Sequence, residues 1–355
     1  MKQIFYALIF CSLFFSACTE EPPVEPLGIY SEGIFTVNEG VFGQTSGTIS
    51  YYDRTDERVE QKIFKQANNR DLGDVVQSMS FYDNKAYIVV NNSNKIEVAD
   101  ANTFEEMAQI TGLRLPRYFL GSANGAKQGY VSEWGADGLT GTIALVDLET
   151  HTVLSRTSVG VGPEQLLIVD GMLYVTHTGG YASNNIVTVI DIGAHQVSTT
   201  IPVLDKPSAC VEAVDGFIWV GCAGEVAYLT YPAIDTANST ESGLVKIDPV
   251  TNTVVQTITF GKGNPIGSLV LNTTNKSELY YRRSGKVWKY TIASGVEEAL
   301  FSGSFYGLGF DPVTNSIYAT TSVGVNAAEA QRYDTSGNLI SSYGVGVFAN
   351  GFVFK

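Results

Sequence analysis

An aromatic residue recurs seven times inside a short apolar segment, and its spacing is the strongest constraint in the sequence. The seven residues are Phe35, Tyr87, Tyr130, Tyr174, Trp219, Tyr280 and Tyr318. The four from Tyr87 to Trp219 are separated by 43, 44 and 45 residues. This spacing is typical of propeller blades, which repeat about every 40 to 45 residues. The pattern therefore predicts a repeated small sheet.

Each aromatic strand belongs to a longer unit with further landmarks. A second strand follows and ends in aspartate in six units, at Asp53, Asp100, Asp147, Asp191, Asp248 and Asp334. A Thr- or Asn-rich turn comes next, because these side chains cap their own backbone. After an outer strand and a Gly or Pro corner, an apolar run ends in a hairpin signal such as Asp170-Gly171. The predicted order is inner, aromatic, aspartate and outer strand.

The two ends of the repeat region complement each other. The first strand, residues 33–37, is an aromatic strand with no inner strand before it, and residues 350–354 form an inner strand with nothing after it. Pairing these two would leave no open sheet edge. We therefore predict an all-β, seven-bladed β-propeller with four-stranded antiparallel blades, closed by the C-terminal strand joining blade one.

The acidic composition narrows the classes of partner. The 355 residues include 36 Asp and Glu but only 22 Lys and Arg, which gives a net charge of −14. Nucleic-acid surfaces need clustered positive charge to neutralise phosphates. We expect no nucleic-acid partner, and we expect anionic polymers to be poor ligands.

The N-terminal residues predict a lipid anchor. Lys2 precedes an apolar run over residues 4–15, and Ser16-Ala17-Cys18 then places small residues before a cysteine. This is the pattern of a lipoprotein signal peptide over residues 1–17, with lipidation at Cys18. The alternative, an uncleaved membrane anchor, is disfavoured because about 12 apolar residues are too few to span a bilayer. Residues 18–29 would be a flexible, proline-stiffened tether and 30–355 the propeller.

Two cysteines remain in the predicted propeller. Cys210 and Cys222 lie on the inner and aromatic strands of blade five, around Asp215-Gly216. A two-residue turn would place their side chains on opposite faces of the sheet, whereas a one-residue bulge would bring them together. A disulfide and a pair of buried thiols are both open alternatives.

Several segments resemble a known group of proteins. Tyr174-Val-Thr-His177 and Trp219-Val-Gly-Cys222 resemble the Tyr-Val-Thr-Asn repeat of seven-bladed propellers. Within that group, Val37-Asn-Glu-Gly40, Ser50-Tyr-Tyr-Asp53 and Pro116-Arg-Tyr-Phe119 resemble surface lipoproteins of Bacteroidetes. One branch captures cobalamin or related corrinoids and passes them to a TonB-dependent outer-membrane transporter. The resemblance implies an outer-membrane protein facing the cell exterior, as does the acidic pair after Cys18, which resembles a surface-export signal.

Propeller geometry directs the search for a site to one rim, where the loops after the aromatic strands meet the corners before the inner strands. The ligand-binding candidates there are Asn38, Phe42, Asp74, Arg117, Tyr118, Trp134, Glu164, Gln165, Tyr181, Tyr231, Phe305 and Tyr306. Rigid aromatic faces beside polar groups suit a large, flat, partly polar ligand. The repeat aromatics, by contrast, are expected to fill the core between blades.

Arg117 and Glu164 each follow a corner proline in neighbouring blades, which predicts a salt bridge across the mouth of the ring. The equivalent positions around the ring are predicted to be Asp74, Arg117, Glu164, Ser208, Ile266, Phe305 and Phe348. Two carboxylates, an arginine and three large apolar groups make a poor cation cage.

Catalytic patterns are weak. The histidines at 151, 177 and 195 lack metal-ligand spacing, and no nucleophile elbow or phosphate loop occurs. We expect a small-molecule binding protein without cofactor, metal or catalytic residues. A protein-interaction or adhesion scaffold is the second hypothesis, and a lactonase-like hydrolase is the third.

Overall fold

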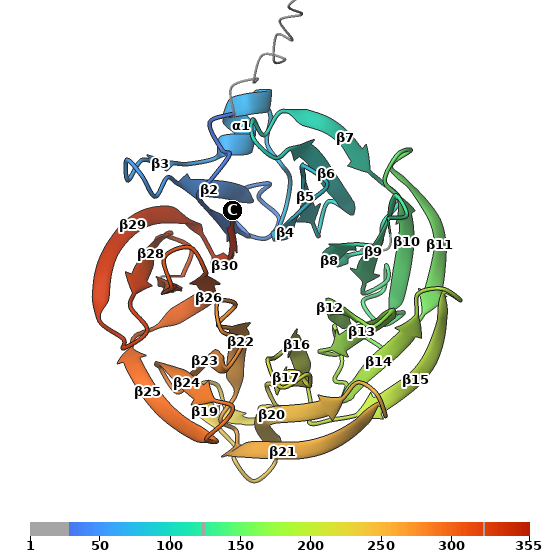
Figure 1. Cartoon of the computed structure of the whole chain (residues 1–355), viewed down its shortest axis with the longest axis vertical. Coiled ribbons are helices and arrows are strands. Elements are labelled where there is room, and N and C mark those ends of the chain that lie inside the picture. Colours follow the sequence, from blue (N-terminus) through green and yellow to red (C-terminus); the bar gives the residue numbers. More distant parts are fainter. Residues whose placement is uncertain (1–27, 123–124, 322–323) are drawn as a thin grey trace, which may run out of the picture.

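The computed structural model describes residues 28–122, 125–321 and 324–355, which form a ring of seven four-stranded antiparallel sheets (Figure 1). The predicted fold class is confirmed. The predicted signal peptide, Cys18 and most of the predicted tether lie outside the described residues. Within the described part of the chain, no helix has the length and apolar character needed to cross a membrane.

The strands of every blade follow the predicted order from the centre of the ring outward. Blade one contains β30 (Ala349–Phe354), β1 (Ile34–Asn38), β2 (Thr48–Tyr52) and β3 (Val59–Glu60). Blade two contains β4 (Val76–Tyr82), β5 (Lys85–Val90), β6 (Lys95–Asp100) and β7 (Glu106–Ile110). Blade three contains β8 (Pro116–Gly121), β9 (Gln128–Glu133), β10 (Thr142–Asp147) and β11 (Thr152–Ser158).

The remaining blades continue around the ring in chain order. Blade four contains β12 (Pro163–Val169), β13 (Met172–His177), β14 (Ile186–Asp191) and β15 (Gln196–Pro202). Blade five contains β16 (Pro207–Glu212), β17 (Ile218–Cys222), β20 (Glu241–Asp248) and β21 (Thr253–Lys262), and a hairpin of β18 (Tyr228–Thr230) and β19 (Ala233–Ile234) extends from it. Blade six contains β22 (Ile266–Leu271), β23 (Glu278–Arg283), β24 (Lys286–Thr291) and β25 (Val296–Ser302). Blade seven contains β26 (Phe305–Asp311), β27 (Ser316–Thr321), β28 (Ala327–Tyr333) and β29 (Leu339–Val347).

The C-terminal strand closes the ring as predicted, because β30 pairs with β1. Gly33 and Lys355 exchange backbone hydrogen bonds of 3.0 Å each. Arg54 then fastens blade one to blade seven, donating to both carboxylate oxygens of Asp311 at 2.9 Å and to the Lys355 carbonyl oxygen at 2.7 Å. Closure therefore combines a sheet ladder with a side-chain clamp.

The repeat aromatics fill the core, as expected. All seven are at most 3% exposed. They also join neighbouring sheets: Tyr87 of blade two stacks on Phe119 of blade three at 4.0 Å, and Tyr280 of blade six stacks on Phe310 of blade seven at 5.8 Å. Burial of such large apolar surfaces holds each blade against the next.

The aspartates that end the third strands act as turn caps. Asp147 accepts hydrogen bonds from the backbone amides of Glu149 and Thr150, both at 2.8 Å. Asp191 accepts from Gly193 and Ala194 in the same way. The recurring aspartate therefore shapes the turn toward the outer strand and does not belong to a binding site.

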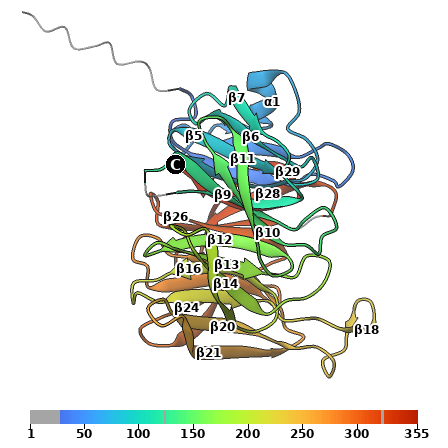
Figure 2. The same ribbon diagram turned by 90° about the vertical axis from the view of Figure 1, so that its right-hand side faces the viewer.

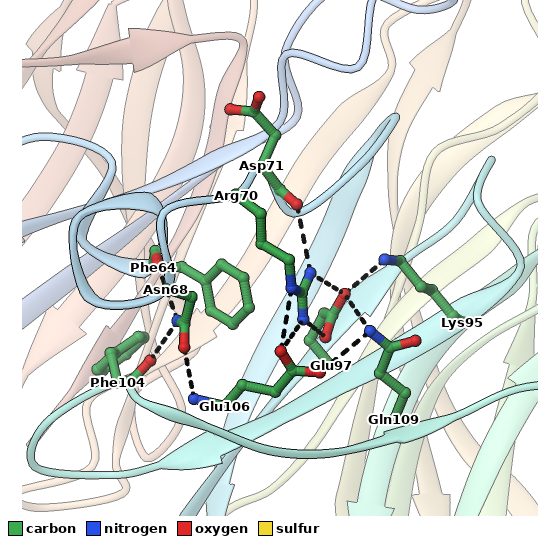
Figure 3. A network of polar contacts seen from close by, with 9 residues as sticks. All are labelled: Phe64, Asn68, Arg70, Asp71, Lys95, Glu97, Phe104, Glu106 and Gln109. Carbon is green, nitrogen blue, oxygen red and sulfur yellow. Dashed lines mark hydrogen bonds and ion pairs between the residues drawn. The ribbon is translucent and has the colours of Figure 1, made fainter.

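Blade one departs from the repeat at its outer edge, where β3 is very short and helix α1 (Ile63–Asn68) follows. Figure 3 shows the polar network that fixes this segment to blade two. The Arg70 guanidinium donates to both oxygens of the buried Glu97, at 2.8 and 2.7 Å, and to Glu106 at 3.0 Å. Sequence analysis did not foresee this helix.

The two-residue turn that would place the two cysteines on opposite faces is not present. The hairpin turn of blade five pairs Glu212 with Ile218, which shifts the register by one residue, and Cys210 then lies opposite Val220. Because Cys222 is two residues after Val220, both thiols face the same side as diagonal neighbours. Diagonal neighbours are too distant for a disulfide, which needs Cβ atoms about 3.8 Å apart. Both thiols are free and buried, and burial raises the pKa of Cys210 to about 12.

Candidate functional site

The inner strands of the ring surround a central cavity of about 670 Å³. Polar side chains line it where the inner strands begin, including Gln77, Tyr118, Gln165, Ser208, Ser268 and Asn350. Apolar side chains such as Leu269, Leu308 and Phe352 line it further along. We call the end at which the inner strands begin the mouth. The long loops after the second strands lie at this same end.

Strand register corrects the predicted ring of equivalent positions at the mouth. In six blades the residue after the repeat aromatic pairs with one inner-strand residue, as Val131 does with Phe119. In blade six the pairing of Tyr280 with Val270 gives Leu269 as the equivalent residue. Two residues before that partner lie Gln77, Arg117, Glu164, Ser208, Gly267, Tyr306 and Asn350. The predicted Asp74, Ile266, Phe305 and Phe348 are wrong because the corners differ in length. The ring at the mouth is therefore largely polar.

The predicted salt bridge between Arg117 and Glu164 is present. Arg117 Nε donates to the two carboxylate oxygens of Glu164 at 3.1 and 3.2 Å, and Nη1 donates to Gln77. The guanidinium also lies 4.1 Å from the ring centre of Trp134. Although burial acts to lower it, the pKa of Arg117 is raised because Glu164 stabilises the charged form.

Glu39 lies at the mouth, and sequence analysis missed this residue. It follows β1 and accepts hydrogen bonds from the Tyr306 hydroxyl and from Asn350 Nδ2, both at 2.9 Å. Burial raises the pKa of Glu39, and the two hydrogen bonds only partly offset this effect. Asn350 Nδ2 also donates to the Gln77 carbonyl oxygen at 2.8 Å, which links blade one to blade two. Asn350 and Gln77 could have been found from the register of β30 and β4.

Tyr118 and Gln165 face the cavity from blades three and four. Burial, followed by the charge of Glu164, raises the pKa of Tyr118 to about 12, so its hydroxyl keeps its proton at neutral pH. It can therefore donate a hydrogen bond to a ligand as well as accept one. Gln165 adds an amide donor and acceptor next to Glu164.

Trp134 and Tyr181 form the aromatic edge of the mouth. Their rings meet edge to face, with centroids 5.8 Å apart. Trp134 lies beneath Arg117, and its buried Nε1 has no hydrogen-bond partner among the described residues. Tyr181 is 69% exposed and is available for contact. Both candidates thus lie at the mouth, and their role in binding a ligand stays a prediction.

Two polar candidates have structural roles instead. Asn38 is fully buried; its Nδ2 donates to Ser50 Oγ at 2.9 Å, and its Oδ1 accepts from the Gly346 amide at 2.9 Å. Asp74 accepts from the Gly43 amide at 3.0 and 2.9 Å and from Asn92. Asn38 and Asp74 are therefore held by hydrogen bonds within the scaffold, and neither lines the cavity.

Three aromatic candidates lie apart from one another. Phe42 is 72% exposed on the loop after β1, and Tyr231 is 81% exposed between β18 and β19. Phe305 packs edge to face against Phe301 and Tyr333, which stack on each other between blades six and seven. The site is thus smaller than the predicted set and is built around the Arg117 pair and Glu39.

The described residues contain no cluster suited to a metal ion, and His177 is buried among hydrogen-bond partners. In residues 28–122, 125–321 and 324–355, no group of three His, Cys, Asp or Glu side chains is arranged to hold a metal ion. His177 is fully buried, with Nδ1 donating to the Val161 carbonyl oxygen at 3.2 Å and Nε2 accepting from Thr188 at 2.9 Å. Burial lowers the pKa of His177 to about 4. His177 therefore links the corner before β12, through Val161, to β14, through Thr188.

Comparison with known proteins places the chain in a family. The family described as "Domain of unknown function (DUF5074)" matches residues 32–355, which is nearly the whole ring. The chain belongs to this DUF5074 family. No curated protein matches the sequence.

A solved structure similar to this DUF5074 chain is the hydrazine synthase of Kuenenia stuttgartiensis. The likeness has a TM-score of 0.60 at 15% sequence identity, and covers 76% of this chain and 85% of the other. At this level of identity, the likeness concerns the fold alone.

Proposed function

We propose that this chain is an outer-membrane surface lipoprotein that binds a small-molecule nutrient at the mouth and works beside a TonB-dependent transporter. The single observation that carries the binding proposal is the polar ring above a cavity of about 670 Å³. Small-molecule sites commonly have volumes of about 300 to 1,000 Å³ and combine apolar walls with a few placed polar groups. Binding, with no chemical change of the ligand, is the proposed activity.

The rigidity of the mouth supports this proposal. Arg117, Glu164 and Gln77 restrain one another, while Glu39 is held by Tyr306 and Asn350. Side chains that are already fixed lose little conformational freedom when a ligand binds. The mouth therefore presents donors and acceptors in a preset arrangement.

A corrinoid is the first ligand to test, because the sequence resembles the corrinoid-capturing branch of Bacteroidetes lipoproteins. A flat macrocycle with amide side chains would lie across the mouth, with its amides against the polar ring and one face on Tyr181. The lipid on Cys18 would keep the propeller at the outer membrane. Radiolabelled palmitate should label the wild-type chain in cells and leave Cys18→Ser unlabelled.

Binding can be tested by calorimetric titration with corrinoids, haem and oligosaccharides. Gln165→Leu removes the amide from the cavity while keeping the side-chain size, and should weaken binding at least about tenfold, because the polar ligand group then lacks its partner. Gln196→Leu makes the same change on the exposed outer strand β15 and should bind within about twofold of wild type. The proposal would be abandoned if none of the three ligand classes bound.

A protein-interaction scaffold is a second candidate, favoured by the β18–β19 hairpin. This hairpin projects away from the ring (Figure 2). Its exposed side chains include Tyr228, Leu229 and Tyr231, and Leu229 is 72% exposed. Exposed apolar groups at one tip are typical of partner contacts. Substituting all three by serine should reduce recovery of the chain with a transporter from detergent-solubilised outer membranes, whereas equal recovery would count against a docking role.

A further inference from the structure

A second pocket of about 380 Å³ opens at the turn between β23 and β24 of blade six. Its lining includes Gly267, Arg282, Arg283, Ser284, Lys286 and Gly303. Three of the residues that line the pocket are basic and none is acidic. In a chain of net charge −14, such a local excess of positive charge is unexpected.

The pocket is open because the turn beside it is short. Blade six joins β23 to β24 through Ser284 and Gly285 alone, whereas the corresponding loop of blade four spans residues 178–185. Gly267 and Gly303 let Arg282 and Phe305 pack closely beside the pocket, because a Cβ atom at Gly303 would lie 2.4 Å from the Phe305 ring. A Cβ atom at Gly267 would lie 2.6 Å from Arg282 Nη2, so glycine is needed there for the guanidinium to occupy its position.

Arg282 enters this pocket without a neutralising partner. Its Nε donates to Ser268 Oγ at 3.2 Å and its Nη1 to the Phe305 carbonyl oxygen, while Nη2 donates to no described group. No carboxylate of the described residues forms an ion pair with it. Burial lowers the pKa of Arg282 to about 10, which still leaves the group charged at neutral pH.

The two neighbouring cations differ in availability. Arg283 is occupied, because it pairs with Glu297 at 2.9 Å and lies between the rings of Phe260 and Trp288 at 4.1 and 4.3 Å. Lys286 is exposed at the opening and, like Arg282, forms no ion pair within the described part of the chain. Arg282 is therefore a largely buried cation without a counter-charge among the described residues, which is costly in the absence of an anion. Lys286 adds a second, solvated cation at the opening of the same pocket.

We propose that this pocket binds a small oxyanion, a phosphate or a carboxylate group, between Arg282 and Lys286. The free Nη2 of Arg282 supplies a charge-assisted hydrogen bond from the wall, and Lys286 supplies a mobile charge from the opening. An anionic polymer would also meet the rest of the chain, whose net charge is negative, and be repelled by it. A small anion inside the pocket would contact mainly the basic residues. The inference goes beyond the proposed function, because an anion can bind here whether or not a ligand occupies the mouth.

The test is calorimetric titration of the full propeller with inorganic phosphate and, separately, with acetate, in chloride buffer. Arg282→Gln should weaken binding at least about tenfold and Lys286→Gln severalfold, because each removes one charged contact. Lys262→Gln makes the same charge change on the exposed strand β21 and should leave binding within about twofold of wild type. Saturable binding of phosphate alone assigns a phosphoryl group, and saturable binding of acetate assigns a carboxylate.

Two results would overturn the proposal: no saturable binding of either anion to the wild type, or Arg282→Gln and Lys286→Gln both binding like Lys262→Gln. Far-UV circular dichroism shows whether each variant is folded. If Arg282→Gln is misfolded, the exposed Lys286→Gln decides the outcome. Phosphate binding retained in Gln165→Leu would separate this pocket from the mouth, so that the two proposals can fail independently.

Discussion

Two arginines lie on opposite sides of the ring, and their surroundings differ. On blade three, Arg117 meets the carboxylate of Glu164, the amide of Gln77 and the ring of Trp134. On blade six, Arg282 meets one hydroxyl and one carbonyl oxygen, and no described carboxylate neutralises it. Both guanidinium groups are largely removed from water, yet only the first has a counter-charge.

This contrast separates scaffold from binding group. Removing either member of a buried ion pair leaves the other charge buried without a partner, which is costly. The pair of Arg117 and Glu164 therefore holds two blades in place. A buried charge without a partner is already strained electrostatically, and an incoming anion relieves that strain. The same residue type therefore organises the mouth on one side and offers a site on the other.

The largest expected effect comes from opening the ring, because both arginines lie between blades of the closed ring. Deleting residues 351–355 removes most of β30, together with the backbone bonds of Lys355 to Gly33 and its bond to Arg54. We expect loss of the single cooperative thermal transition, measured by circular dichroism, because an open ring exposes two sheet edges. If the truncated chain melts like the intact one, β30 does not hold the ring closed.

Glu164→Gln should have the next largest effect. It leaves the Arg117 guanidinium without its carboxylate, and we expect the free energy of unfolding to fall by about 3 kcal/mol. Urea denaturation at pH 7 measures this loss.

Arg282→Gln is the matched test on the other side of the ring. This substitution leaves no described carboxylate unpaired. We therefore expect the free energy of unfolding to fall by only about 1 kcal/mol, through the loss of two hydrogen bonds and some packing. Equal losses in Glu164→Gln and Arg282→Gln would contradict the distinction between the two arginines.

A further effect depends on pH and comes from His177 of blade four, the blade that carries Glu164. The pKa of His177 is about 4 in the folded chain, below the ordinary value of 6.5. A base whose pKa is lowered by folding stabilises the fold fully above pH 6.5, and this contribution is lost as pH falls toward 4. At pH 5 we expect the wild type to have lost about 2 kcal/mol from this group relative to pH 7.

His177→Gln should therefore lose less stability than the wild type between pH 7 and pH 5, as followed by urea denaturation at each pH. Comparing the two isolates His177, because Glu39 acts with the opposite sign. Its raised pKa means that folding favours its protonated form, so its contribution improves as pH falls. Parallel pH profiles for wild type and variant would show that His177 is not the acid-sensitive group.

The fold could be predicted because its information is local and repeated. Aromatics such as Tyr87 and Tyr174 recur at the blade period, and aspartates such as Asp147 cap equivalent turns, so each unit supports the assignment of the next. Helix α1 could not be found this way, because it occurs once and replaces most of an outer strand.

The site was only partly predictable. Arg117 and Glu164 could be matched because each follows a proline, which fixes the corner in sequence. Gln77 and Asn350 have no such marker, and their corners differ in length, so counting from the corner selected Asp74 and Phe348 instead. Positions that depend on strand register, such as the pairing of Cys210, need the exact number of residues in a turn, which composition does not give.

Ring closure by β30 also means that the order of blades in the gene is partly arbitrary. Because Gly33 and Lys355 are hydrogen-bonded neighbours, a short peptide could join Lys355 to Gly33 in a propeller that starts at residue 33, and new termini could be opened at the exposed tip between β18 and β19. The propeller would keep its contacts after such a circular permutation. The mouth of the cavity would then be rebuilt from the same seven inner strands in a different synthetic order.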